Sequence, residues 1–436
     1  MSQTENRPLW FWVFTPVNAS IGIFLTLLPI YVLNLGGNVV EVGIVTSSFL
    51  LSQVPSFLVW GCILDLFPSR KKYIVFSYIT MSAILALLYL YGQLRFLPFF
   101  VAVFGFIFAL PPQATNLLIM EIFTKTKWPK MLAEISFVSI TGYVFGVIIG
   151  IIWSSFYELK DLIILSAIPP LISGILVLKF VHEPTMISEK EVSKEVILHK
   201  AKVFLDSFAH LMRLHDYKVF LKVRHLVFFR EAPILYFSVF VFNIGWQIYV
   251  TSYIPSLKQR YILDNQIFLI TLSHILAQAF ILHYINRKRI FEHHTTVDIA
   301  KLTLKIVIGT FIITGAEILL FNQSTYIAIN LVIYAILGGS IALYNPSASS
   351  LVFGTLSHRE KSRILGIYSA AVLFCSFTGA FISGYLTNYF GYFITFLTAA
   401  ILTAISLYLV GLSAKIGERA RLLHDIITYG QFFQDK

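Results

Sequence analysis

Long apolar runs separated by short polar segments recur along most of the chain. The first extends from about Leu9 to Leu33, and the others begin near Val42, Tyr73, Leu97, Ile135, Leu162, Pro233, Ile267, Ala300, Thr325, Ile364 and Gly391. A helix needs about 20 apolar residues to cross a bilayer. Lipid offers no hydrogen-bond partners, so only helices and closed barrels, which pair their own backbone groups, can span it. The pattern therefore predicts an all-α membrane protein of twelve transmembrane helices. The first run is too long for the apolar part of a signal peptide, so we expect an uncleaved first span.

Composition and charge support this class and predict an orientation. Hydrophobic residues make up 57% of the 436 residues and charged residues only 13%, which excludes a soluble globule. The loops alternate between the two sides of the membrane. Those on one side hold only four of the 33 Lys and Arg residues, namely Arg95, Lys160, Lys258 and Arg260. Because basic residues collect on the cytoplasmic side, we expect a multi-pass protein of the cell membrane with both termini cytoplasmic. The net charge of +11 lies in clusters beside the spans, so we expect it to face the lipid bilayer and no nucleic acid.

A charged stretch from about Val181 to Phe229 separates six spans from six. The predicted organisation is a six-helix bundle over 1–181, a cytoplasmic linker over 182–229, a second six-helix bundle over 230–414 and a cytoplasmic tail over 415–436. Within the linker, apolar residues recur at helical spacing and predict an amphipathic helix; they are Val192, Val196, Val203, Phe204, Phe208 and Leu211. A docking site for a partner protein is the alternative interpretation.

The two halves align as copies at an offset of 233 positions. Lys130 falls on Arg363 and Gly146 on Gly379, so a basic residue that opens a span and a glycine sixteen residues later keep their spacing. A parallel repeat of six spans predicts two pseudo-symmetric bundles that face each other across an axis normal to the membrane.

One loop carries a family signature. Between the second and third spans stands Gly61-Cys-Ile-Leu-Asp65-Leu-Phe-Pro68-Ser-Arg70-Lys71-Lys72. It resembles the signature loop of the major facilitator superfamily, in which Gly61, Asp65, Arg70 and Lys71 match in identity and spacing. The sequence departs from that signature at Leu66, where the family has a basic residue, and at Pro68, where it has glycine. The resemblance implies a twelve-helix transporter of alternating access.

In that family the loop takes part in gating, which gives Gly61, Asp65, Arg70, Lys71 and Lys72 a candidate role. A carboxylate such as Asp65 can cap the positive end of a helix in the other bundle, and the family's partner is the eleventh span, near Arg363. The basic residues have a simpler interpretation as an anchor at the cytoplasmic surface.

Small residues predict close helix packing in two equivalent spans. Gly142, Gly146 and Gly150 lie on one face of the fifth span, and Cys375, Gly379 and Ser383 on one face of the eleventh. The family's antiporters carry a Gly-Pro pair in the fifth span, but Val147 stands in place of that proline. The segment from Gly384 to Gly391 resembles the family's turn between the last two spans.

By the same resemblance, particular spans line a central cavity. The polar residues on them form the candidate substrate cavity, and they are Asn18, Gln53, Asn243, Gln247, Thr271, Gln278 and Asn345. Taken singly, each has an alternative role in a hydrogen bond between helices. Spans 1, 4, 7 and 10 hold no deep Asp, Glu, Lys or Arg, which disfavours anionic substrates that need a cationic clamp. The expected substrate is a small neutral or amphipathic solute.

Two ionisable residues lie within the remaining apolar runs. His274 stands near the middle of the eighth span, on one face with Thr271 and Gln278, and is the candidate for proton coupling because imidazole titrates close to neutral pH. The alternative is a neutral imidazole bonded to a neighbour. Glu317 is expected to reach the membrane interface from the end of the ninth span and to be structural.

No catalytic or cofactor pattern accompanies these features. The spans lack paired carboxylates and His-rich metal spacings, and Cys62 and Cys375 lie inside apolar runs, so we expect no metal, no cofactor and no enzyme. A membrane-embedded receptor or enzyme without transport activity is the alternative function. The chain is expected to act as a monomer, and the direction of transport stays open.

Overall fold

The computed structural model describes residues 8–67, 69–124, 127–182, 232–288, 296–320, 323–354 and 361–434. These residues form helices joined by short connections, and they include no strand. The helices of the first half are η1 (Leu9–Phe14), α1 (Thr15–Asn34), α2 (Val39–Leu66), α3 (Arg70–Tyr91), α4 (Leu97–Phe108), α5 (Leu110–Ile122), α6 (Trp128–Phe156) and α7 (Leu159–Phe180). Those of the second half are α11 (Ala232–Gln259), α12 (Asp264–Lys288), α14 (Thr296–Leu320), α15 (Gln323–Gly354) and α16 (Lys361–Gln434).

The last element, α16, contains two crossings. Its apolar part, Tyr368–Ile416, is 49 residues long, whereas about 20 residues cross a bilayer. Gly391 has a φ of 78°, a left-handed conformation that glycine adopts without strain. The Oγ1 atoms of Thr387 and Thr395 lie 3.0 Å apart, although they would be about 12 Å apart along one straight helix. The chain therefore reverses at Gly391, and Gly384 belongs to the helix before the turn.

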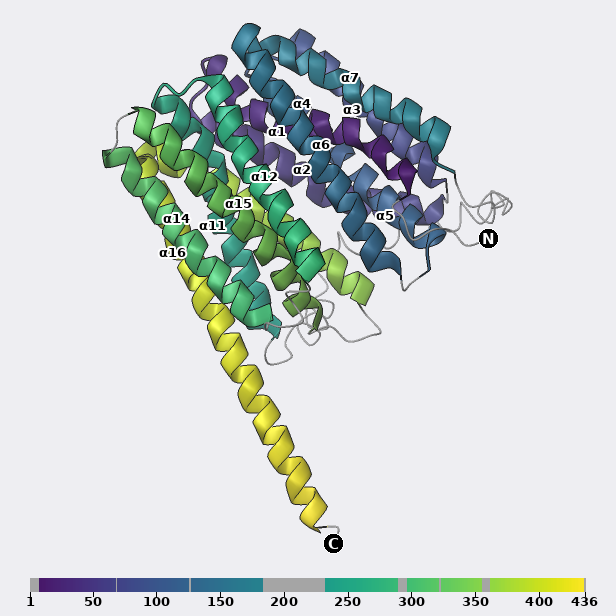
Figure 1. Cartoon of the computed structure of the whole chain (residues 1–436), viewed down its shortest axis with the longest axis vertical. Coiled ribbons are helices and arrows are strands. Elements are labelled where there is room, and N and C mark those ends of the chain that lie inside the picture. Colours follow the sequence, from purple (N-terminus) through teal and green to yellow (C-terminus); the bar gives the residue numbers. More distant parts are fainter. Residues whose placement is uncertain are drawn as a thin grey trace, which may run out of the picture.

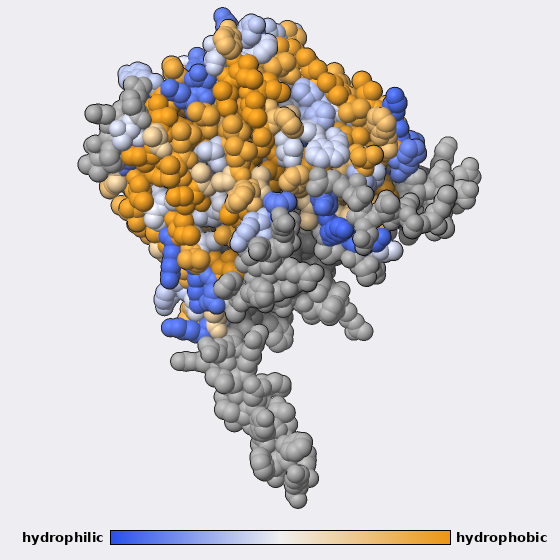
Figure 2. All heavy atoms as spheres, viewed as in Figure 1, coloured by the Kyte–Doolittle hydropathy of each residue, from blue (hydrophilic) through white to orange (hydrophobic). Residues whose placement is uncertain are grey.

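With that reversal, the candidate spans give the predicted two halves of six crossings. Figure 1 shows the halves side by side, the first in purple to blue and the second in teal to yellow. Figure 2 shows hydrophobic side chains over the middle of one face and hydrophilic ones gathered toward its margins. Large apolar residues of the candidate spans stay exposed, such as Ile175 at 65% and Phe280 at 68%, because lipid takes the place of a second protein layer.

Local sequence explains where helices start and where one breaks. Asn38 caps α2 by accepting from the Val40 amide at 2.7 Å, while the Glu41 carboxylate accepts from the Asn38 amide at 2.8 Å, which is a capping box. The fourth crossing is divided into α4 and α5 at Ala109. Pro111 and Pro112 follow at once, and neither can donate the backbone hydrogen bond that a continuous helix requires.

The halves contact each other through α2 with α16 and through α6 with α12. At the end away from the linker, a Cβ on Gly384 would lie 3.0 Å from the Val40 Cα, and Asn265 Nδ2 donates to Ser155 Oγ at 3.2 Å. We call this the closed end. The other end, where α7 stops and α11 begins, is the linker end. The linker itself lies outside the described residues.

Candidate functional site

The predicted cavity amides mostly bond to their own helices. Asn18 Nδ2 donates to the Phe14 carbonyl at 2.7 Å, Gln53 Nε2 to that of Phe49 at 3.2 Å, and Asn243 Nδ2 to that of Val239 at 2.8 Å. These bonds use one donor and leave each amide oxygen available to a ligand. Gln247 and Thr271 likewise bond within α11 and α12. Gln278 is half-buried and Asn345 exposed, and neither bonds to a described residue.

A cavity of about 240 Å³ lies within the first half, between α1, α3, the α4–α5 break and α6. Of the predicted cavity residues, only Asn18 lines it. Its lining combines amides and hydroxyls with aromatic and apolar surface, and it includes Asn18, Thr115, Asn116, Ser136, Ser139, Phe14, Tyr78, Met81, Phe108, Pro111, Pro112 and Tyr143. No Asp, Glu, Lys or Arg is among the described residues that line it. The Pro111-Pro112 pair was the available sequence signal for this site, because broken helices at membrane depth occur where they are buried in protein or line a cavity.

In the second half, His274 lies among aromatic rings. Its ring centroid is 4.6 Å from that of Tyr334 and 6.5 Å from that of Trp246. The Nδ1 atom is 3.1 Å from the Tyr334 carbonyl. Since a carbonyl can only accept, Nδ1 carries the proton in the neutral ring. Nε2 is then the atom at which a further proton would bind.

The expectation that Glu317 reaches the membrane interface is wrong. Its side chain is 0% exposed, and neither carboxylate oxygen accepts a hydrogen bond from any residue that the structure describes. The carboxyl group points inward because the rotation of α14 about its axis places it against α15 and α11. The hydropathy of an apolar run predicts the depth of a residue along the helix axis but not this rotation.

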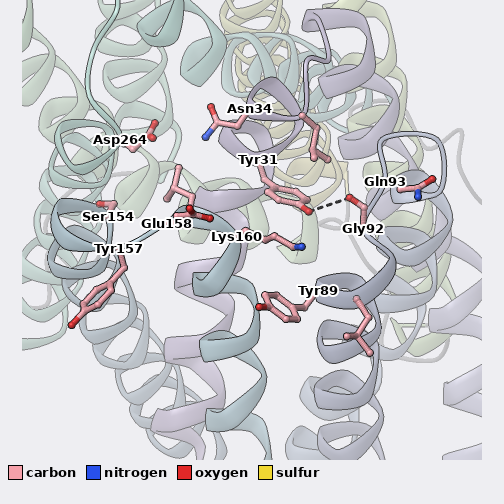
Figure 3. Close-up of a pocket in the computed structure, with 13 residues that line it drawn as sticks. Tyr31, Asn34, Tyr89, Gly92, Gln93, Ser154, Tyr157, Glu158, Lys160 and Asp264 are labelled. Carbon is pink, nitrogen blue, oxygen red and sulfur yellow. Dashed lines mark hydrogen bonds between the residues drawn. The ribbon is translucent and has the colours of Figure 1, made fainter.

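The cavity at the closed end is larger, about 640 Å³, and differs in chemistry. Figure 3 shows Tyr31, Tyr89, Glu158 and Lys160 from the first half around it, with Asp264 from α12 of the second half. The Lys160 ammonium lies 5.1 Å from the centre of the Tyr89 ring. None of the predicted cavity residues lines this cavity.

The signature loop is braced inside the first half. Arg70 is 7% exposed, donates to the Leu64 and Phe67 carbonyls at the end of α2, and pairs with Glu121 of α5 at 2.9 Å. Lys71 Nζ donates to the Leu178 carbonyl near the end of α7 at 2.8 Å, so both cations lie at negative helix ends. Lys72 is exposed. The side chains of Asp65 and of the first residues of α16 lie outside the described set, and the gating contact stays a prediction.

The small residues of α6 and α16 meet backbone of neighbouring helices. A Cβ on Gly146 would collide with the Ala19 backbone, one on Gly142 with Thr15 and Asn18, and one on Gly150 with the Phe268 ring. Gly379 of α16 similarly faces the Ile244 backbone of α11. Ser383 instead bonds, with Oγ 2.6 Å from Ser252 Oγ.

Comparison with known proteins gives a family and a fold. A model of the Major Facilitator Superfamily matches residues 11–356. No curated protein matches the sequence. Among solved structures, the nucleoside transporter NupG is 14% identical with a TM-score of 0.66, covering 94% of this chain and 99% of that chain. The xylose transporter XylE from E. coli, in an inward open conformation, is 12% identical with a TM-score of 0.65, covering 91% and 94%. A bacterial homologue of the human lysosomal transporter Spinster is 11% identical with a TM-score of 0.64, covering 94% and 96%.

Proposed function

The chain belongs to the major facilitator superfamily, and we propose that it moves a small neutral or amphipathic solute by alternating access between its two halves. The family and the transporters among its structural neighbours make it a secondary transporter and not an enzyme. The alternative of a receptor or enzyme without transport activity loses its basis.

The proposal of a small neutral or amphipathic solute rests on the cavity of the first half. Amide and hydroxyl groups there leave acceptors and donors for a polar solute, while Phe14, Tyr78 and Tyr143 offer apolar surface. A lining without fixed charge provides no counter-ion for a phosphate or dicarboxylate. A mixed apolar and polar lining of this kind is typical of small-molecule sites.

Contacts at the closed end support alternating access. The halves meet there through backbone at Gly384 and through the Asn265 to Ser155 bond. In Figure 1 the helices of the two halves fan apart toward the linker end. If the positive-inside rule holds, this state faces the cytoplasm. A cysteine placed at Ser193 should then resist external labelling in oriented vesicles, and external labelling would reverse the orientation.

The solute proposal is tested by a thermal-shift screen of purified protein against a solute library, followed by binding measurements on the hits. Thr115 is 5% exposed, lines the cavity and makes no hydrogen bond to another described residue. Losing one solute hydrogen bond costs about 1 kcal/mol, so Thr115→Ala should weaken binding about five-fold. Thr80 is the matched control, because its exposed hydroxyl bonds only to its own helix, at the Phe76 carbonyl. Equal affinity in the two variants, or hits confined to anions, would contradict the proposal.

We also infer that transport is coupled to protons through the second half, with His274 as one titratable group. The ring is fixed by its Nδ1 bond and leaves Nε2 for a proton. His274→Gln keeps hydrogen-bonding capacity and should reduce the pH-gradient dependence of accumulation in proteoliposomes while solute exchange survives. Accumulation equal to wild type would remove His274 from the coupling.

A further inference from the structure

Glu317 is enclosed within the second half, close to the closed end. Beside its unpaired carboxylate lies a second unpaired group, the Tyr326 hydroxyl, which is buried and makes no hydrogen bond to a described residue. An acceptor and a donor therefore lie near each other without being bonded. Buried polar groups are almost always paired, and two unpaired groups in one place therefore call for a functional explanation.

The groups that face Glu317 come from three elements. From α11 come Tyr249 and Tyr253, and the turn after α11 brings Arg260. From α15 come Asn330 and Tyr326. From α16, Phe393 and Phe396 pack against the neighbouring Gly315 and contribute no charge. Arg260 is thus the one described cation that acts on this carboxyl group, and it is partly solvated.

In the present arrangement none of these described neighbours donates a hydrogen bond to the carboxylate oxygens. The Arg260 guanidinium carbon is 5.4 Å from the centre of the Tyr326 ring, which is a cation-π contact. The Asn330 amide donates to the Tyr326 carbonyl at 2.9 Å, and its oxygen accepts from Tyr253 at 2.7 Å. A buried, unpaired carboxylate costs several kcal/mol and is avoided by taking up a proton. The geometry is that of a neutral carboxylic acid.

We propose that Glu317 is a proton-binding site of the transporter, protonated in the state described here and ionised when Arg260 and the Tyr326 hydroxyl turn onto it. On release, the carboxyl O–H bond breaks, the proton passes to water at the closed end, and the charge left on the oxygens pairs with Arg260. The inference rests on the proposed transport function and adds Glu317 to the groups that couple transport to protons. Ionisation is thereby tied to one of two arrangements of the same side chains.

A proton fits this site better than a metal cation. Sodium or calcium would need several converging oxygens, but the Asn330 oxygen is already used by Tyr253. The positive charge of Arg260 also opposes a second cation. Glu317 is the only carboxylate among the described residues that face this site.

The site is connected by direct contacts to His274. Asn330 accepts from Tyr253, the Tyr253 ring lies 4.3 Å from the Tyr334 ring, and Tyr334 contacts His274. The same α11 helix bonds across to α16, since Ser252 Oγ lies 2.7 Å from Thr387 Oγ1. Movement of Tyr326 and Arg260 at Glu317 therefore acts on a helix that packs toward the interface between the halves.

The transport test compares Glu317→Gln with Glu158→Gln in proteoliposomes. The amide that Glu317→Gln introduces imitates the protonated acid, and Glu158 is an exposed carboxylate at the same end of the molecule. Glu317→Gln should lose at least ten-fold in pH-gradient-driven accumulation and keep solute counterflow, whereas Glu158→Gln should match wild type in both. Full pH-gradient-driven accumulation in Glu317→Gln overturns the proposal, and so does an accumulation that depends on sodium and is lost with Glu317. Absence of counterflow in wild type would instead count against the proposed function.

A second readout needs no transport. Infrared difference spectroscopy of the purified protein should show the carbonyl stretch of a buried carboxylic acid near neutral pH, and Glu317→Gln should abolish it. Arg260→Gln removes the cation and should leave a larger share of Glu317 protonated at a given high pH. A spectrum without that acid band, or a band unchanged in Glu317→Gln, overturns the proposal. Arg260→Gln also covers the case in which Glu317→Gln does not fold.

Discussion

The two halves share a backbone plan but differ in what their interiors hold. In each, a glycine at the equivalent position, Gly146 or Gly379, brings a long helix against the first helix of that half. The interior of the first half opens into a cavity lined by neutral polar and aromatic groups. The interior of the second encloses Glu317, Asn330 and a stack of tyrosines. A repeated scaffold thus keeps its close packing while its polar side chains diverge, and we propose that this divergence separates solute contact from proton binding.

The largest expected effect breaks the shared packing. Gly146→Leu and Gly379→Leu should each prevent recovery of folded protein, because the new side chain meets backbone, which cannot move aside as a flexible side chain can. Gly309→Leu is the control, since nothing lies within 4 Å of its Cβ position. The measurement is the monodisperse fraction and the unfolding temperature in detergent. Equal yields for all three variants would contradict the packing account.

A second prediction compares one ion pair from each half. The Arg70 and Glu121 side chains are 9% and 25% exposed, and Arg70 also binds two carbonyls. Removing a buried, paired charge costs about 3–5 kcal/mol. Because Arg70 is the buried partner and its loss also leaves two carbonyls without their donor, Arg70→Ala should lower the unfolding temperature strongly.

The counterpart in the second half is the pair of Lys258 and Asp264, which are 24% and 23% exposed and lie 2.6 Å apart. Both partners are more exposed than Arg70, and pairs near the surface contribute about 0–1 kcal/mol. Asp264→Asn should therefore shift the same temperature only slightly. A larger shift for Asp264→Asn than for Arg70→Ala would reverse the comparison.

A smaller effect is expected from the hydroxyl chain of the second half. Ser252 is 0% exposed and lies within hydrogen-bond distance of Ser383 and Thr387. Ser252→Ala leaves two buried hydroxyls with fewer partners, which costs about 1–3 kcal/mol. Ser136→Ala in the first half is the control, because that hydroxyl bonds only to its own helix, at the Leu132 carbonyl. If the two variants unfold at the same temperature, the hydroxyl chain does not contribute to stability.

The sequence was sufficient for the family, the fold class and the division into halves. Apolar runs and basic loops report on crossing number directly, because the bilayer imposes one length and one charge bias on every span. The turn between the last two crossings was placed too broadly: of its two glycines, Gly391 adopts a left-handed φ, while Gly384 packs against Val39 and Val40. Glycine marks both a turn and a close approach, and composition does not distinguish them.

The candidate sites were harder to predict. Polar residues in a span are visible in the sequence, but their rotation about the helix axis is set by packing, which is why Glu317 was expected at the interface and is enclosed instead. Asn18 lines the first-half cavity, yet Thr115 and Asn116 escaped notice although the prolines before them marked a broken helix. Hydrogen bonds such as that between Tyr253 and Asn330 join residues 77 positions apart, and periodicity carries no information about such contacts.

The division of labour between the halves is tested most directly by one assay on two variants. Solute counterflow and pH-gradient-driven accumulation are measured in the same proteoliposomes for Thr115→Ala and Glu317→Gln. Thr115→Ala should reduce both activities in proportion at low solute concentration, because it weakens solute binding, and Glu317→Gln should reduce accumulation alone. If the two variants lowered both activities to the same extent, solute and proton would not be handled by separate halves.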